Sequence, residues 1–121
     1  MSVCALVAYG KDNVDKATIG FTLANAALEQ GEQVRAILAS EGVRLAVKGY
    51  ADDINNGEPF NPLKPLMDEF LQKGGELNVC TPCMKKRKIQ EADLIQHKHV
   101  HLIAGPDVIR ILNTTDRSIQ L

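Results

Sequence analysis

A repeated alternation of short apolar runs with helical patterns is the feature that most constrains this chain. Residues 3–8 form an apolar run that ends at Gly10, and residues 33–39, which are largely apolar apart from Gln33 and Arg35, predict a second strand. Continuous apolar runs of this length are typical of parallel strands that are covered on both faces. Because a helical pattern follows each run, the sequence predicts β-then-α units in an open, mostly parallel sheet with helices on both faces.

The remaining elements follow the same alternation. The expected strands are residues 3–8, 33–39, 76–80, 99–104 and 117–121. The first expected helix has cap candidates at Asp12, Asn13 and Asp15 and is closed by Gly31, and a short helix follows over 43–48. Asn61 is expected to cap the next helix, with Pro62 at its first position, and Thr81 to cap the one that opens at Pro82. A helical turn over 91–95 and a helix over 105–112 complete the set. Residues 50–61 lack periodicity and predict a surface loop. The sequence therefore predicts a three-layer α/β fold of about five strands.

Length and composition limit the class of protein. The 121 residues are 45% hydrophobic, which suits one domain over 1–121 with its own core. Fourteen Lys and Arg against fifteen Asp and Glu give a net charge of -1, and aromatic residues make up only 4%. We therefore expect neither a nucleic-acid partner nor a membrane partner. The apolar start lacks the basic region of a signal peptide, and no apolar run reaches the ~20 residues of a membrane span.

Three cysteines are an odd number, which cannot form a closed internal disulfide framework. We therefore expect a reducing, cytoplasmic environment. Cys4 lies inside the first apolar strand, so it is predicted to be a small core residue. Whether Cys80 and Cys83 pair with each other is left open by the sequence.

The turn Cys80-Thr81-Pro82-Cys83 joins a predicted strand to a predicted helix. A helix N-terminus stabilises a thiolate through its dipole and its free N–H groups. Four cations follow at once and add a local positive field: Lys85, Lys86, Arg87 and Lys88. The pattern predicts a thiolate of low pKa, or a persulfide anion in its place. The alternative is that the turn has no chemical role and is only a helix cap followed by a run of solvated charges.

Three chemistries compete for this turn. Thioredoxin-type disulfide exchange fits CTPC between a strand and a helix, although the motif lies two-thirds along the chain. Zinc fits the spacing from Cys80 and Cys83 to His97 and His101, but a strand would hold the two histidines roughly 13 Å apart. Two ligands of one zinc cannot be so distant, so no metal is expected. Sulfur relay needs the same activated thiolate as disulfide exchange, so the residues alone do not separate the two.

Two further turns lie at predicted strand ends. Gly10-Lys11-Asp12-Asn13 could cradle an anion, but no nucleotide-binding pattern is present and a plain polar turn is favoured. Ser40, Glu41 and Gly42 follow the second strand, at the same edge as Cys80 if the strands are parallel. We expect them either to line the cysteine pocket or to start a helix. The role of His97, His99 and His101 is left open.

Taken over its whole length, the chain resembles the DsrE/DsrF-like family of small sulfur-relay proteins. The most specific matches are the Ser40-Glu41-Gly42-Val43 turn and the segment LNVC followed by a short basic helix. The resemblance implies a three-layer α/β fold, assembly into trimers, hexamers or hetero-oligomers, and sulfur transfer without an organic cofactor. It implies that Cys80 is the sulfur carrier, and Cys83 matches a second cysteine of YchN-like members. Lys88 departs from the pattern, because many members have Gly there.

The sequence thus favours a sulfurtransferase-type relay protein that carries a persulfide on Cys80 and passes sulfane sulfur from a donor protein to an acceptor protein. Cys83 would resolve or protect the persulfide. Thr81, Pro82, Lys85, Lys86 and Arg87, with Ser40, Glu41 and Gly42, would support the pocket or contact a partner. Two alternatives remain: a non-catalytic subunit of a sulfur-relay complex, and a thioredoxin-like oxidoreductase that uses both thiols.

Overall fold

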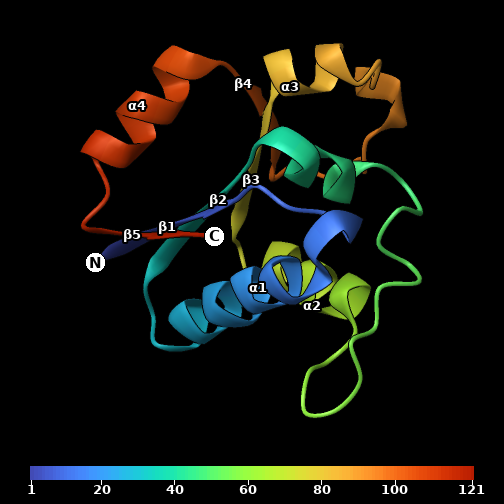
Figure 1. Ribbon diagram of the computed structural model, residues 1–121. Coiled ribbons are helices and arrows are strands. Elements are labelled where there is room, and N and C mark those ends of the chain that lie inside the picture. Colours follow the sequence, from blue (N-terminus) through green and yellow to red (C-terminus); the bar gives the residue numbers. More distant parts are fainter.

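The computed structural model describes all residues 1–121. Its five strands form one sheet in the order β4-β3-β2-β1-β5, and every neighbouring pair is parallel (Figure 1). The strands are β1 (Ser2–Val7), β2 (Gln33–Leu38), β3 (Glu76–Cys80), β4 (Val100–Ile103) and β5 (Arg117–Gln120). The predicted five-stranded α/β fold is confirmed, and the sheet is parallel throughout.

The helices cover both faces of this sheet unequally (Figure 1). The helices are α1 (Val14–Glu29), α2 (Leu63–Gln72), α3 (Thr81–Lys86) and α4 (Gly105–Asn113), with short 3-10 helices η1 (Lys11–Asn13), η2 (Ser40–Ala46) and η3 (Glu91–Asp93). Right-handed crossovers that step from β1 to β3 place α1 and α2 on one face. The connection from β4 to β5 crosses the sheet in the opposite direction, so its helix α4 lies on the other face. No helix is both long enough and apolar enough to cross a membrane.

The main core lies between the sheet and the pair α1 and α2. It holds 22 buried residues, and at its centre the rings of Phe21 and Phe70 meet edge to face with centroids 5.6 Å apart. A second cluster under α4 has only three buried members, Cys4, Ile37 and Ile103. Cys4 is fully buried, and burial raises the pKa of its thiol to about 11, so its predicted place in the core is confirmed.

Several predicted boundaries are wrong by a few residues. The expected helix over 43–48 is instead the 3-10 helix η2, which begins directly after β2. Helix α2 begins after Pro62, so Asn61 is not its cap. The cap position of α3 is Cys80 rather than Thr81, because the Thr81 hydroxyl donates to the Ile103 carbonyl oxygen at 3.0 Å. The structure thus uses that hydroxyl to tie α3 to the end of β4.

Candidate functional site

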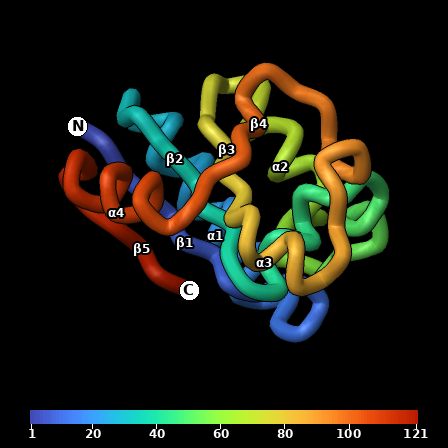
Figure 2. Tube along the Cα trace, turned by 90° about the horizontal axis from the view of Figure 1, so that it is seen from above, coloured from blue at the N-terminus to red at the C-terminus, as the bar shows by residue number.

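The carboxyl ends of β2 and β3 meet at one edge of the sheet, where the chain enters η2 and α3. Strand β2 pairs in parallel with β3, and Leu38 lies opposite Val79. Residues that follow the two strands are therefore neighbours, and Figure 2 shows η2 beside α3. The prediction that Ser40, Glu41 and Gly42 share an edge with Cys80 is confirmed.

Cys80 and Cys83 are both free and partly exposed. Cys80 is the last residue of β3 and lies opposite Ile103 of β4, while Cys83 lies in the first turn of α3. Pro82 also lies in that turn, where its missing N–H costs nothing because the first helical N–H groups have no partner within the helix. The strand and the helix together hold two thiols at an open edge of the sheet, as the cysteine spacing predicted.

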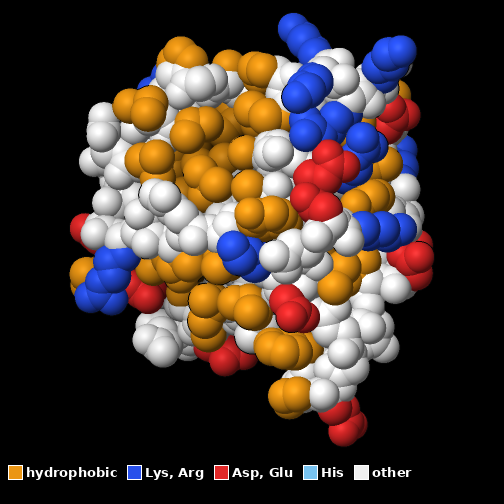
Figure 3. All heavy atoms as spheres, viewed as in Figure 1, with side chains coloured by type: hydrophobic (Ala, Val, Ile, Leu, Met, Phe, Trp, Pro, Cys, Tyr) orange, Lys and Arg blue, Asp and Glu red, His pale blue; other side chains and the backbone are white.

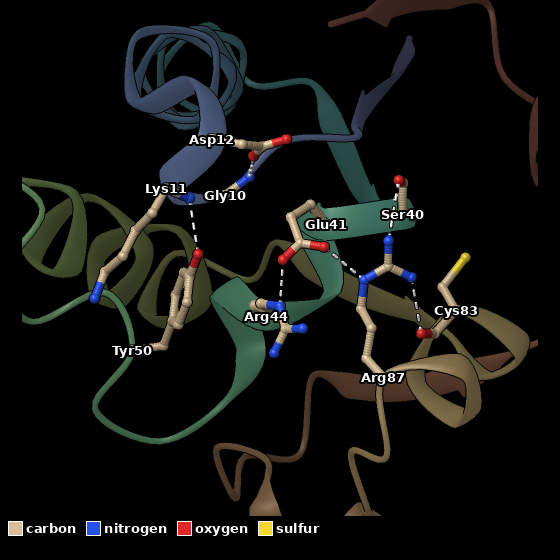
Figure 4. Close-up of polar contacts among 9 residues, drawn as sticks. All are labelled: Gly10, Lys11, Asp12, Ser40, Glu41, Arg44, Tyr50, Cys83 and Arg87. Atoms are coloured by element: carbon tan, nitrogen blue, oxygen red, sulfur yellow. Dashed lines mark hydrogen bonds and ion pairs between the residues drawn. The ribbon is translucent and has the colours of Figure 1, made fainter.

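Arg87, directly after α3, makes three side-chain contacts, two of which join it to η2 (Figure 4). Its Nε donates to Glu41 Oε2 at 2.7 Å, Nη1 donates to the Cys83 carbonyl oxygen at 3.1 Å, and Nη2 donates to Ser40 Oγ at 3.4 Å. The side chain of Arg87 is only 13% exposed. Arg44 pairs with the other Glu41 oxygen, a partner that the sequence analysis missed. Hydrogen bonds from Arg87 and Arg44 hold the pKa of Glu41 below its ordinary value.

The cations after Cys83 do not act as one group. Arg87 turns inward, whereas Lys85, Lys86 and Lys88 are exposed. No carboxylate lies within ion-pair distance of these three lysines. We call Lys85, Lys86 and Lys88 the lysine cluster. The predicted cationic field thus separates into one structural arginine and three free surface charges.

The predicted low pKa of the site thiol is wrong for Cys80, whose pKa is raised above its ordinary value. Burial is the largest cause, because it penalises the thiolate, and the neighbouring Cys83 thiol raises the pKa further. The Cys83 backbone N–H and the Arg87 charge act in the opposite direction, but no side-chain hydrogen bond caps α3. At neutral pH the resting form of Cys80 is therefore the protonated thiol.

We expect alkylation of Cys80 by iodoacetamide to show a pH midpoint above the ordinary value of 9.0, because the thiolate is the nucleophile. The rate should be followed separately at Cys80 and Cys83 by peptide mass. Cys83→Ser should lower the Cys80 midpoint, since it removes the neighbouring thiol. A wild-type midpoint at or below about 7 would contradict the assignment.

The turn after β2 requires a glycine at position 42. A Cβ on this buried residue would lie 2.2 Å from the carbonyl oxygen of Val7. Only glycine therefore lets η2 pack directly onto the end of β1. Ser40 starts the turn with a φ of 51°, in the left-handed region that most residues avoid.

Lys88 also has a left-handed backbone, with a φ of 57°, directly after α3. This conformation costs a residue with a Cβ about 1 kcal/mol, and glycine avoids that cost. The glycine that many members of the resembled family carry there is thus explained.

We expect Lys88→Gly to raise the free energy of unfolding by roughly 0.5–1 kcal/mol, measured by urea denaturation. Lys86→Gly is the matched control. Because Lys86 is helical, this variant should lower the free energy of unfolding by a similar amount. Equal effects of the same sign at both positions would contradict the backbone explanation.

Two backbone amides of the loop after β1 donate hydrogen bonds within the protein. The Gly10 N–H donates to Asp12 Oδ1 at 2.8 Å, and the Lys11 N–H donates to the hydroxyl of Tyr50 at 2.8 Å (Figure 4). These two donors are thus already used within the protein. The contacts favour the interpretation as a plain polar turn.

The histidines lie on or beside the edge strand β4. Glu76 Oε1 is 3.0 Å from His99 Nδ1, and its Oε2 is 2.5 Å from His101 Nε2. His97 Nδ1 accepts the backbone N–H of His99 at 3.0 Å. No three His, Cys, Asp or Glu side chains converge on a point that could hold a metal ion. His99 and His101 thus pair with Glu76 of β3 rather than with the cysteines.

These features define a class: a small parallel α/β domain with a free thiol pair where a strand enters a helix. The model of the DsrE/DsrF-like family matches residues 1–121, so the chain belongs to that family, which is generally one of sulfur-relay proteins. The chain is 32% identical over 111 residues to the uncharacterized protein MK0008 of Methanopyrus kandleri, covering 92% of this chain and 84% of that protein. It is 34% identical over 111 residues to the uncharacterized protein MJ0989 of Methanocaldococcus jannaschii, covering 92% and 89%.

Solved structures show the same fold. The crystal structure of the ychN protein from E. coli matches with a TM-score of 0.78 at 16% identity, covering 99% of this chain and 97% of that chain. MTH1491 from Methanobacterium thermoautotrophicum, a protein of unknown function, matches with a TM-score of 0.70 at 11% identity, covering 99% and 97%. At these identities the likeness concerns the fold alone.

Proposed function

We propose that this protein is a cytoplasmic sulfur-relay protein that carries sulfane sulfur as a persulfide on Cys80. The observation that carries the proposal is the position of Cys80, partly exposed at a strand end beside Cys83, in a chain of this family. The donor and the acceptor would be proteins that present thiols, and the carrier would act as a homo-oligomer or hetero-oligomer.

The transfer consists of two displacements at sulfur. The Cys80 thiolate attacks the terminal sulfur of a donor persulfide R–S–SH, so that a new S–S bond forms and R–S⁻ leaves. The proton lost by the Cys80 thiol is available to that leaving thiolate. An acceptor thiolate then attacks the terminal sulfur of the Cys80 persulfide, and the Cys80 thiolate is released. No net oxidation occurs, because sulfane sulfur passes from one thiol to another.

Burial of Cys80 suits a carrier that must not react with every oxidant. The thiol is mostly protonated at neutral pH, because its pKa is raised, so it is a poor nucleophile at rest. A persulfide places the reactive sulfur about 2 Å further from Cys80 Sγ. The transferred atom would therefore be more accessible to an acceptor than the carrier thiol itself.

Cys83 could remove the terminal sulfur from the Cys80 persulfide. Its thiolate would attack Sγ of the Cys80 persulfide, form the Cys80–Cys83 disulfide and release hydrosulfide. A dithiol reductant would then restore both thiols by disulfide exchange. Cys83 would thus protect the site when no acceptor is bound.

A persulfide donor added to the reduced protein tests the proposal by intact mass. We expect a one-sulfur adduct that disappears in Cys80→Ser and persists in Cys83→Ser. Cys4→Ala is the matched control, since Cys4 is fully buried in β1, and its adduct should equal that of wild type. If no adduct forms on Cys80, the carrier role fails and a non-catalytic subunit is favoured. Reduction of insulin disulfides that requires both Cys80 and Cys83 would instead favour a thioredoxin-like oxidoreductase.

A further inference from the structure

A basic surface and an apolar surface adjoin beside the thiols. The lysine cluster lies at and just after the end of α3, and Lys86 is three residues from Cys83, on the same side of the helix. Other lysines of the chain do have carboxylate partners, as in Lys11 with Asp53 and Lys64 with Asp68. The unpaired charges of the cluster therefore remain available to a partner.

The apolar surface belongs to α4 and to the sheet beneath it. Helix α4 has no buried residue, although four of its nine residues are apolar: Val108, Ile109, Ile111 and Leu112. Ile109 is 57% exposed. The other three, together with Leu6, pack on the three-residue cluster while staying partly exposed. An exposed apolar patch of this kind, bordered by polar residues, marks an interaction site.

The two surfaces form one continuous face. Figure 3 shows the apolar patch on the α4 side of the molecule meeting the basic side chains over α3. The starts of the two helices are tied together, because Thr81 donates to Ile103 and Cys80 pairs with Ile103 in the sheet. The thiol pair therefore lies where the basic and apolar parts adjoin.

We propose that this face docks a segment of a partner protein that is rich in carboxylates and apolar side chains, and brings that partner's thiol to Cys80. The inference rests on the proposed function for the direction of sulfur transfer, whereas the docking itself does not depend on it. Carboxylates of the segment would contact the lysine cluster, and its apolar side chains would cover α4. A chain segment fits better than nucleic acid, because the protein has a net charge of -1, and 4% aromatic residues leave little to stack on bases.

Fluorescence anisotropy with labelled peptides tests the docking in the Cys80→Ser/Cys83→Ser protein, in which no sulfur can move. We expect a peptide of alternating Glu and Leu to bind, more weakly as NaCl rises from about 20 to about 300 mM. A peptide with Lys in place of Glu should not bind, and one with Ser in place of Leu should bind more weakly. Lys85→Glu/Lys86→Glu should reduce affinity for the Glu and Leu peptide about tenfold or more.

The control variant Lys64→Glu/Lys98→Glu has the same charge change outside the face, and its affinity should stay within about twofold of the parent protein. Ile109→Asp tests the apolar part at an exposed position and should also weaken binding. Three outcomes would overturn the docking: equal loss in both double variants, equal binding to phosphatidylserine vesicles, or a lysine-dependent change in self-association by sedimentation. A persulfide adduct that forms on Cys80 from a small donor would support the proposed function whichever of these outcomes is found.

Discussion

Gly42→Ala should lower the free energy of unfolding by about 3 kcal/mol or more, the largest effect expected of one methyl group in this chain. The added Cβ would lie 2.2 Å from the Val7 carbonyl oxygen and 3.0 Å from the Val7 carbonyl carbon. Both atoms are backbone at the end of a central strand, so they cannot move aside without disturbing the pairing of β1 with β2. Thermal unfolding should show a midpoint lower by about 10 °C.

Gly105→Ala is the matched control for that clash. No atom lies within 4 Å of a Cβ at this position, which is the first residue of α4. Its stability should therefore equal that of wild type or exceed it slightly. A Gly42→Ala protein as stable as Gly105→Ala would show that η2 does not pack on β1 as described. We also expect Gly42→Ala to change the reactivity of Cys80, because η2 positions Glu41 for Arg87.

Arg87→Ala should have the second largest effect, a loss of about 2 kcal/mol in the free energy of unfolding. The change removes two hydrogen bonds that join the end of α3 to η2 and a third to the Cys83 carbonyl oxygen within α3. It leaves the half-buried Glu41 with Arg44 alone. Urea denaturation near pH 7 measures the loss. Lys86→Ala is the matched control, since it removes an exposed, unpaired cation from the same helix.

The Arg87 effect has a predictable pH dependence. The folded protein holds the pKa of Glu41 below its ordinary value of 4.5, so the stabilisation is complete above that pH and is lost as pH falls through the folded pKa. The difference between wild type and Arg87→Ala should therefore shrink in acid. The Cys80 alkylation midpoint should move up in Arg87→Ala and stay unchanged in Lys86→Ala, because Arg87 is the one cation that lowers the pKa of Cys80, beside the Cys83 backbone N–H. Equal midpoints in all three proteins would contradict this role for Arg87.

The order and kind of the elements were predictable because they depend on local patterns. The apolar runs, the Asn13 cap of α1 and the strand that ends at Cys80 all appear where their sequence signals lie. The start of η2 was misjudged because its first residue, Ser40, has a left-handed backbone that no propensity indicates. Asn61 failed as a cap for a comparable reason, since the chain around Pro62 is held by the Leu63 N–H, which donates to the Ile54 carbonyl oxygen.

By itself, the sequence determined that two thiols stand at the carboxyl end of a parallel strand, followed by four cations. Only the tertiary structure decided what those cations do, because the pairing of β2 with β3 brings Glu41 within reach of Arg87 and leaves the lysines in solvent. It also decided that Cys80 has a raised pKa, since desolvation depends on what packs around the thiol. Spacing along a chain sets which groups are near in sequence, whereas burial and ion pairing depend on contacts between distant segments.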